Sequence, residues 1–297
     1  MMRSAGISFL SGVPKETTDG VSRTALAVAG ARWLETESDT PLCHDPWAGP
    51  LAGDDGRTLA QLLDRHTPEQ RKLMALRTAY LDREVAYHIE DLGIQQVVIL
   101  GAGLDTRAAR LGAPGVRFFE VDRGPTQADK LRRLGTLPDY PTDAASYVPC
   151  DLATDDLFDR LAEAGFSAHA PALVLMEGLS VYLTTEAVAG LLRTVATQTH
   201  PESQVIFDYL NPRLRESEAP DQLRHLASRI LQGEPMRWFC EDPLPLLRGT
   251  GFQYVRTSNL DAFCLQVTGE LGRRWGTHLY SIAHAARVVL RRANMSW

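Results

Sequence analysis

Short apolar runs recur along the chain and predict the strands of a buried sheet. The first, Val97–Leu100, is wholly apolar and rich in β-branched residues, which is typical of a strand buried on both faces of a parallel sheet. Similar runs predict further strands at 118–122, 146–152, 172–178, 204–210, 252–257 and 278–289. Helical patterns lie between several of these runs, and this order indicates an α/β fold with a mostly parallel sheet.

Two longer segments ahead of the first strand have the spacing of helices. Arg23–Glu35 carries apolar residues at helical intervals, with Ser22 as the expected N-cap. Gly30 lies inside this segment and costs about 1 kcal/mol of helix propensity relative to alanine. Pro68 begins a second helix that extends to about Leu92 along one mostly apolar stripe. These segments predict a helical N-terminal cap over residues 1–92, followed by a domain over 93–297.

Residues 211–245 are polar and marked by prolines, and we expect an insertion over the strand ends there. One helical stretch is predicted near Asp221–Leu231. Met236, Trp238 and Phe239 could form an apolar wall of this insertion.

Two glycines directly follow the first strand, at Gly101 and Gly103. Such glycines permit a tight turn and a close approach of a ligand to the backbone. Glu120 and Asp122 end the next apolar run, 19 and 21 residues after Gly101, where an acid reaches a ribose diol in nucleotide-binding units. Thr106 stands where a third glycine would serve a pyrophosphate, which argues against a dinucleotide and favours an adenosine ligand without phosphate, such as S-adenosylmethionine.

Acidic residues also follow two later strands. Asp151 could accept a hydrogen bond from an adenine amino group, or it could cap a helix over 154–164. Pro149 predicts that its run is an edge strand or ends there, rather than a central strand. Glu177 ends the fourth apolar run abruptly. Because ligands of open α/β sheets bind beyond the carboxyl ends of the strands, these acids and the two glycines are expected to surround one site.

Two arginines ahead of the first strand could reach a ligand carboxylate. Arg23 lies in the first turn of its helix, where a cation is unfavourable, and it is either a surface residue or a ligand contact. Arg77 lies roughly 80° from the centre of the apolar stripe and borders the buried face. From there it could enter a cleft and bind a carboxylate, or form a salt bridge to another element.

Composition narrows the class of protein. The chain has 297 residues, 44% hydrophobic and 23% charged, as in an ordinary globular protein. A net charge of −6 gives no reason to expect nucleic acid as a partner, and no apolar run is long enough to span a membrane. The N-terminus does not resemble a signal peptide. The four cysteines are widely spaced, so reduced thiols in a cytoplasmic protein are expected rather than a metal site.

Seven motifs occur in order along the chain. They are Ser22-Arg23-Thr24-Ala25, His44-Asp45-Pro46-Trp47, Arg77-Thr78-Ala79-Tyr80, Gly101-Ala102-Gly103-Leu104-Asp105-Thr106-Arg107, Phe119-Glu120-Val121-Asp122, Cys150-Asp151-Leu152 and Glu177-Gly178-Leu179-Ser180-Val181-Tyr182-Leu183. Together they resemble the leucine carboxyl methyltransferase family, including its bacterial members that methylate polyketides and other small molecules. The resemblance implies a Rossmann-like class I methyltransferase with a seven-stranded, mostly parallel sheet whose last strand is antiparallel, preceded by a helical cap.

The resemblance also implies roles around S-adenosylmethionine. Arg77 and Arg23 would hold the methionine carboxylate, and Glu177 would face the amino group. Asp122, with Glu120 as a neighbouring candidate, would bind the ribose hydroxyls. The backbone at Gly101 and Gly103 would pass close to the cofactor. Asp151 and Leu152 would lie on either side of the adenine, and Tyr182 would lie toward the acceptor.

The expected reaction is O-methylation of a carboxylate or hydroxyl of a small molecule. A carboxylate is already ionised at pH 7 and needs no general base, whereas a phenol would benefit from a base such as His44 or His278. A protein C-terminus as acceptor, an NAD-dependent oxidoreductase and a nonenzymatic ligand-binding relative stay open as alternatives. The acceptor's identity and the oligomeric state are not determined by the sequence.

Overall fold

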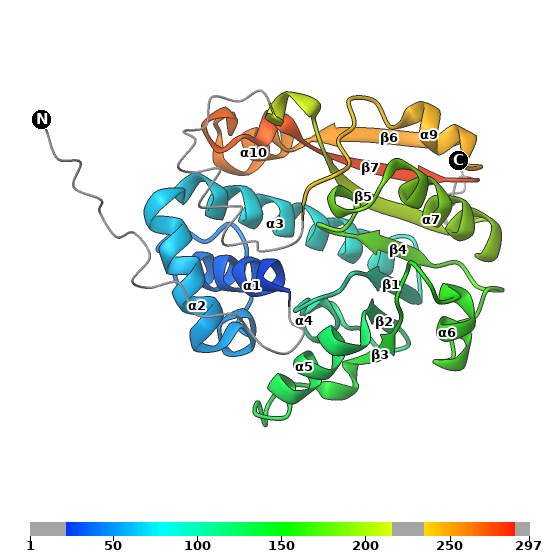
Figure 1. Ribbon diagram of the computed structural model, residues 1–297, viewed down its shortest axis with the longest axis horizontal. Coiled ribbons are helices and arrows are strands. Elements are labelled where there is room, and N and C mark those ends of the chain that lie inside the picture. The colour runs from blue at the N-terminus through cyan, green and yellow to red at the C-terminus, as the bar shows by residue number, and fades with distance from the viewer. Residues whose placement is uncertain (1–21, 216–234, 289–297) are drawn as a thin grey trace, which may run out of the picture.

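Seven strands form one mixed sheet in the order β3-β2-β1-β4-β5-β7-β6 (Figure 1). The computed structural model describes residues 22–215 and 235–288. Strands β1 to β5 pair in parallel, and β7 runs antiparallel to both β5 and β6, which confirms the predicted fold. The strands are β1 (Gln96–Leu100), β2 (Arg117–Asp122), β3 (Ala145–Pro149), β4 (Leu173–Met176), β5 (Gln204–Leu210), β6 (Tyr254–Asn259) and β7 (Tyr280–Ala286).

Helices cover both faces of this sheet. Three of them, α1 (Arg23–Thr36), α2 (Ala48–His66) and α3 (Pro68–Glu90), precede β1. The others are α4 (Arg107–Leu111), α5 (Gly124–Leu134), α6 (Leu157–Glu163), α7 (Thr185–Gln198), α9 (Leu244–Gly249) and α10 (Leu260–Thr268), with 3-10 turns η1 (Thr142–Ala144), η2 (Ser180–Tyr182), η3 (Pro212–Arg215), η4 (Arg273–Trp275) and η5 (Thr277–Leu279). Side chains of α3 and α10 pack against one face, and those of α6, α7 and α9 against the other.

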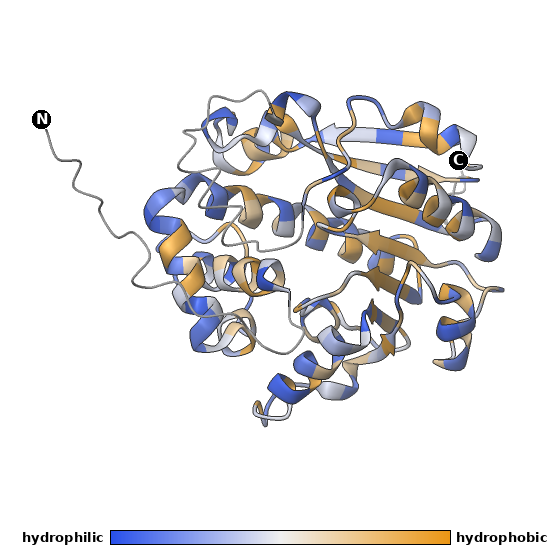
Figure 2. Cartoon of the chain, viewed as in Figure 1, coloured by the Kyte–Doolittle hydropathy of each residue, from blue (hydrophilic) through white to orange (hydrophobic). Residues whose placement is uncertain are grey.

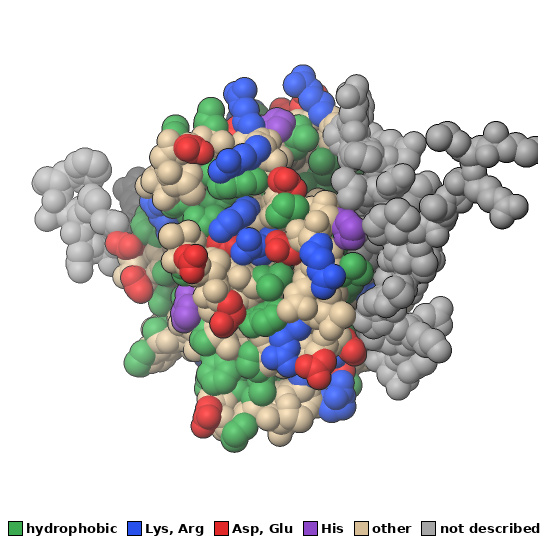
Figure 3. Space-filling view, turned by 90° about the vertical axis from the view of Figure 1, so that its left-hand side faces the viewer, with side chains coloured by type: hydrophobic (Ala, Val, Ile, Leu, Met, Phe, Trp, Pro, Cys, Tyr) green, Lys and Arg blue, Asp and Glu red, His purple; other side chains and the backbone are tan. Residues whose placement is uncertain are grey.

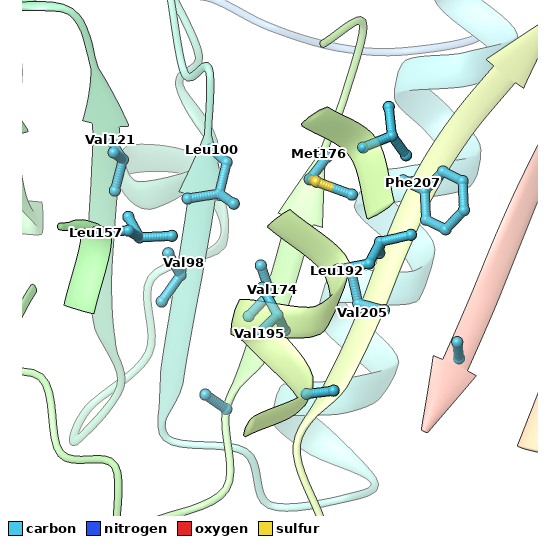
Figure 4. Packing of buried hydrophobic residues seen from close by; sticks show 14 of the residues in the cluster. Val98, Leu100, Val121, Leu157, Val174, Met176, Leu192, Val195, Val205 and Phe207 are labelled. Carbon is cyan, nitrogen blue, oxygen red and sulfur yellow. The ribbon is translucent and has the colours of Figure 1, made fainter. Parts of the chain in front are cut away.

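The core lies between the sheet and these two helical layers. Alternate residues along the central strands face opposite layers, as expected for strands buried on both sides. Val98, Val174 and Val205 point toward Leu192 and Val195 of α7 in one of the two layers (Figure 4). The hydropathy colouring shows the same arrangement, with the most apolar residues concentrated on the central strands (Figure 2).

The strand order indicates where a ligand is expected to bind. The sheet grows outward from β1 in one direction through β2 and β3, and in the other through β4 and β5. Connections on the two sides cover opposite faces, and at such a point ligands of open α/β sheets usually bind beyond the carboxyl ends of the strands, here β1 and β4. The residues that follow these two strands are therefore the candidates for a binding site.

Several local predictions are confirmed. Ser22 caps α1 and its side chain accepts from the Ala25 N–H at 3.3 Å. The strand that ends in Pro149 lies at the edge of the sheet, beside β2 alone among the described strands. His284 of β7 is also buried, and its Nε2 lies 3.0 Å from the Tyr80 hydroxyl.

Other boundaries differ from the sequence prediction. The helix expected from residue 154 begins at Leu157, because Asp156 is its cap and accepts from the N–H groups of Phe158 and Asp159. Helices α2, α5, α9 and α10 were not predicted. In α2 the reason is visible: Gly53 has φ 63° and interrupts the helix with a kink. The helix expected near Asp221–Leu231 lies outside the described residues.

No helix in the described ranges is both long and apolar enough to cross a bilayer. Seen from the side that carries α2, Lys and Arg side chains are interspersed with Asp and Glu (Figure 3). The described part of this face therefore presents no continuous field of one charge sign. Over the same residues, no group of three or more His, Cys, Asp or Glu side chains is arranged to hold a metal ion.

Helices α1 and α2 cross at glycines, and this crossing explains the unfavourable Gly30. A Cβ at Gly30 would lie 2.4 Å from the Gly56 carbonyl oxygen and 2.6 Å from the Ala60 Cβ. The helix therefore loses intrinsic propensity at Gly30 and gains a close approach of the two backbones.

We expect Gly30→Ala to lower the free energy of unfolding by about 1–3 kcal/mol, because the added methyl overpacks the α1–α2 crossing. Gly190→Ala is the matched control, since a Cβ at Gly190 in α7 meets no atom within 4 Å. The control should be neutral or stabilising by up to about 1 kcal/mol, from helix propensity alone. Urea unfolding of both variants measures the difference, and equal effects would contradict the packing argument.

Candidate functional site

The turn after β1 adopts conformations that favour glycine. Gly101 has φ 67° and Gly103 has φ 49°, both in the left-handed region. A Cβ at Gly101 would lie 3.1 Å from Leu179, and one at Gly103 would lie 3.1 Å from Ala25 of α1. These glycines thus serve the backbone turn, and they also let two distant segments approach it.

Asp122 ties this turn to the end of β2. Its Oδ2 accepts from the Gly103 N–H at 2.7 Å, and its Oδ1 accepts from the Arg123 N–H at 2.7 Å. The side chain is half-buried, and each carboxylate oxygen can accept more than one hydrogen bond. The structure therefore brings Asp122 and the glycine turn together, as the sequence predicted.

Glu120 lies elsewhere, although it is only two residues away. It is fully buried and its carboxylate pairs with the Lys130 ammonium group of α5. Burial raises the pKa of Glu120 to about 7, although Lys130 opposes the shift. Since this carboxylate has no exposed surface, Asp122 is the better candidate for ribose hydroxyls.

Arg77 and Glu177 meet beyond the carboxyl end of β4. Arg77 Nε donates to Glu177 Oε1 at 2.7 Å, across a sequence separation of 100 residues. Arg77 is buried on α3, and Glu177 directly follows β4. Of the two alternatives considered for Arg77, the structure therefore shows the salt bridge to another element, and contact with a ligand carboxylate stays a prediction.

Arg77 is also fixed from its other side. Its Nη1 donates to the Tyr280 hydroxyl at 2.6 Å and to Asp208 Oδ2 at 3.4 Å. Asp208 in turn accepts from the Gly178 N–H at 2.8 Å, and from the Tyr280 hydroxyl. The Nη2 group of Arg77 makes no hydrogen bond to the described part of the chain, so it keeps donors for a ligand.

Arg107 is a second buried cation at the same carboxylate. Its Nη1 lies 2.6 Å from Glu177 Oε2, and its Nε donates to Asp82 Oδ1 of α3 at 2.7 Å. It also pairs with Asp105 in the turn itself. Burial alone would raise the pKa of Glu177, but Arg107 and Arg77 lower it below its ordinary value. Glu177 is therefore held ionised in a buried position.

The ion pairs continue into the helices that precede β1 (α1, α2 and α3), which we call the cap. Asp82 also pairs with Arg110 of α4, and Arg110 Nε donates to the Thr106 hydroxyl at 2.9 Å. Asp45 accepts from that hydroxyl at 2.7 Å and from Arg32 Nε of α1 at 2.8 Å. A continuous polar network thus joins the cap to the glycine turn and to β4.

The other residues expected at the site are dispersed around it. Asp151 is exposed after β3 and accepts from the Ala153 N–H at 3.0 Å, so the helix-capping alternative is not observed. Leu152 is half-buried against the core, and Arg23 is buried at the start of α1. Tyr182 is half-buried in η2.

The described end of the insertion passes over the strand ends. The N–H groups of Arg237 and Trp238 both donate to the Val181 carbonyl, at 2.7 and 3.1 Å. The Cys240 N–H donates to the carbonyl of Leu210, the last residue of β5. Trp238 is buried against the sheet and Phe239 is half-buried, whereas Met236 is exposed, so two of the three expected wall residues face inward.

Sequence reasoning missed most of the ion network. Asp82, Asp105, Asp208, Arg107 and Tyr280 were given no role, although Arg107 ends the glycine motif and Asp208 interrupts an apolar strand. An acid inside a buried run was a usable signal, because such an acid needs a partner. The identity of that partner comes from a different element in each case and could not be read locally.

The chemistry of these side chains fits an amino acid attached to an adenosine. Arg77 keeps free N–H donors for a carboxylate, and Glu177 keeps accepting lone pairs for an ammonium group. Asp122 offers a carboxylate for a diol beside the glycine turn. The residues present therefore suit S-adenosylmethionine.

Comparisons with known proteins find relatives that are named as methyltransferases. A relative from Mycobacterium tuberculosis, named "Putative S-adenosyl-L-methionine-dependent methyltransferase", is 34% identical over 236 residues, which cover 75% of this chain and 72% of the relative. A relative of the same name from Mycolicibacterium smegmatis is 35% identical over 234 residues, which cover 74% and 72% of the two chains. A DUF574 family protein from Streptomyces avermitilis shares the fold, with a TM-score of 0.58 at 16% identity over 88% of this chain and 97% of that one.

The sequence profile named leucine carboxyl methyltransferase matches residues 25–196. This range contains the whole glycine turn, Arg77, Asp122 and Glu177. The chain therefore belongs to the leucine carboxyl methyltransferase family, and S-adenosylmethionine is the cofactor for which its relatives are named.

Proposed function

We propose that this S-adenosylmethionine-dependent methyltransferase acts on an oxygen atom of a small molecule, with a carboxylate as the preferred acceptor and a hydroxyl as the second choice. The observation that carries the cofactor half is the Arg77–Glu177 pair beyond β4, beside the glycine turn. Polyketides and other secondary metabolites are the acceptor classes that we consider first.

Each binding residue has a distinct task in this proposal. The Nη2 donors of Arg77 bind the methionine carboxylate, with Arg23 as the second cation, and Glu177 accepts from the amino group. Asp122 accepts from the ribose hydroxyls beside Gly103. Asp151 and Leu152 frame the adenine.

The chain contributes mainly orientation. When bound, the cofactor supplies an activated methyl group on a sulfonium. Arg77 and Glu177 are held by contacts within the protein, so these side chains would lose little freedom on binding a ligand. Holding two reactants in line can contribute several kcal/mol, up to about 7–11 kcal/mol in well-oriented systems.

A carboxylate acceptor would need no general base from the protein. A carboxylate with a pKa of about 4 is ionised at pH 7 and needs no proton removed. His44 and His278, the two bases considered for a hydroxyl acceptor, are both exposed. We place Tyr182 toward the acceptor, as a group that contacts it.

A small acceptor suits the cover over the strand ends. The segment at Arg237 and Trp238 is pinned to Val181 of η2, next to Tyr182. We infer that this cover favours a compact acceptor over a folded protein surface. All four cysteines are free thiols, which suits the cytoplasmic location that we propose.

Calorimetric titration with S-adenosylhomocysteine, 5′-methylthioadenosine and NAD tests the cofactor assignment. We expect Arg77→Lys to weaken S-adenosylhomocysteine binding about tenfold or more, because lysine lacks the guanidinium fork, and to leave 5′-methylthioadenosine binding unchanged. Asp122→Asn should weaken both adenosine ligands. Circular dichroism controls for folding. Binding of NAD alone, or of none of the three, would contradict the cofactor assignment.

The pH profile of turnover tests the acceptor class. With a carboxylate acceptor we expect kcat/KM to be flat between about pH 6.5 and 8.5, because the acceptor is ionised throughout. His44→Ala and His278→Ala should leave it unchanged. A rate that rises with pH and falls in either variant would indicate a hydroxyl acceptor and a general base. Faster methylation of a peptide carboxyl terminus than of any small acid would contradict the small-molecule assignment.

A further inference from the structure

The Glu177 carboxylate is held from two sides, and only one of the two arginines has a role in the proposed binding of the cofactor. We propose that Arg107 is a positioning residue. It binds the carboxylate oxygen of Glu177 that Arg77 Nε does not bind, and so orients this carboxylate to accept from the amino group of the cofactor. The inference rests on the proposed function, because it assumes the amino-group role of Glu177. It extends that role to a residue of the glycine motif and, through Asp82, to the cap.

The geometry gives each arginine one oxygen of the carboxylate. Arg77 Nε binds Oε1 at 2.7 Å and Arg107 Nη1 binds Oε2 at 2.6 Å. A glutamate side chain has three rotatable bonds, and a single contact leaves the plane of its carboxylate free to turn. Two contacts, one to each oxygen, fix that plane, and the remaining lone pairs then point in set directions.

Arg107 is itself held by partners that belong to neither ligand nor acceptor. Its Nε donates to Asp82 at 2.7 Å, its Nη1 pairs with Asp105, and only 2% of the residue is exposed. A guanidinium can bridge these acids because its donors diverge in one plane, whereas an ammonium group is a point charge. Arg107→Lys therefore keeps the charge and loses the bridge.

A purely structural role is the competing explanation, since Arg107 also joins α4 to α3. Arg110 separates the two explanations. It lies one turn later on the same short helix, binds the same Asp82, and its side chain is 9% exposed. Arg110 does not contact Glu177 in the described structure. A variant of Arg110 thus disturbs the α3–α4 junction without touching the carboxylate.

The experiment compares Arg107→Lys with Arg110→Lys by calorimetry, using S-adenosylhomocysteine and 5′-methylthioadenosine as probes. The second probe lacks the amino-acid half, so it does not depend on Glu177. We expect Arg107→Lys to weaken S-adenosylhomocysteine about tenfold and to leave 5′-methylthioadenosine within twofold. Arg110→Lys should leave both affinities within twofold.

A double-mutant cycle provides the second readout. In a Glu177→Gln background, Arg107→Lys should have no further effect on S-adenosylhomocysteine, because Arg107 acts through the carboxylate that has been removed. An undiminished tenfold loss in that background would overturn the proposal. So would equal losses in Arg107→Lys and Arg110→Lys, or a parallel loss for both probes.

Three remaining outcomes are also decisive. If Arg107→Lys does not fold, Asp82→Asn takes its place, and unchanged binding of both probes by that variant overturns the proposal. If the wild-type protein binds neither probe, the proposed function fails. If it binds S-adenosylhomocysteine and Arg107→Lys binds it equally well, the proposed function stands and the role of Arg107 is rejected.

Discussion

A carboxylate clamped between two buried guanidinium groups is the interaction on which the site depends. Removing a charge from water costs free energy unless the charge has a partner. Glu177, whose side chain is only 10% exposed at the end of β4, therefore depends on Arg77 and Arg107. These cations need further acids, which Asp208 and Asp82 supply. The need for paired charges therefore extends from β4 to α3 and α4.

The same network joins the cap to the sheet. The chain of pairs from Arg32 through Asp45 and Thr106 to Arg110 crosses from α1 to α4. Apolar packing at the Gly30 crossing holds α1 against α2 and therefore supports this chain. A shift of α1 or α3 would leave buried charges unpaired, so this network helps to hold the cap against the sheet.

Elements with strong local signals were predictable. The apolar runs located all seven strands, and Pro149 placed its strand at the sheet edge because proline cannot donate to a second neighbour. Helix α2 escaped prediction since its kink and three glycines resemble a loop. At the site, the glycine turn and Asp122 belong to one continuous strand–turn–helix–strand unit, so their proximity followed from spacing.

The fold class, the family and the residue types at the strand ends could be read from the amino-acid sequence, because they depend on periodicity and on motifs of fixed spacing. The pairing of charges depends on how the helices and strands pack in three dimensions. Glu120 and Asp122 look equivalent in the sequence, yet Lys130 of α5 holds one in the core while the other faces the glycine turn. Arg77 and Glu177 are 100 residues apart, and their pairing exists only because the parallel sheet brings β4 beside β1 and against α3. Ion pairs carry no local pattern, and their partners are set by packing.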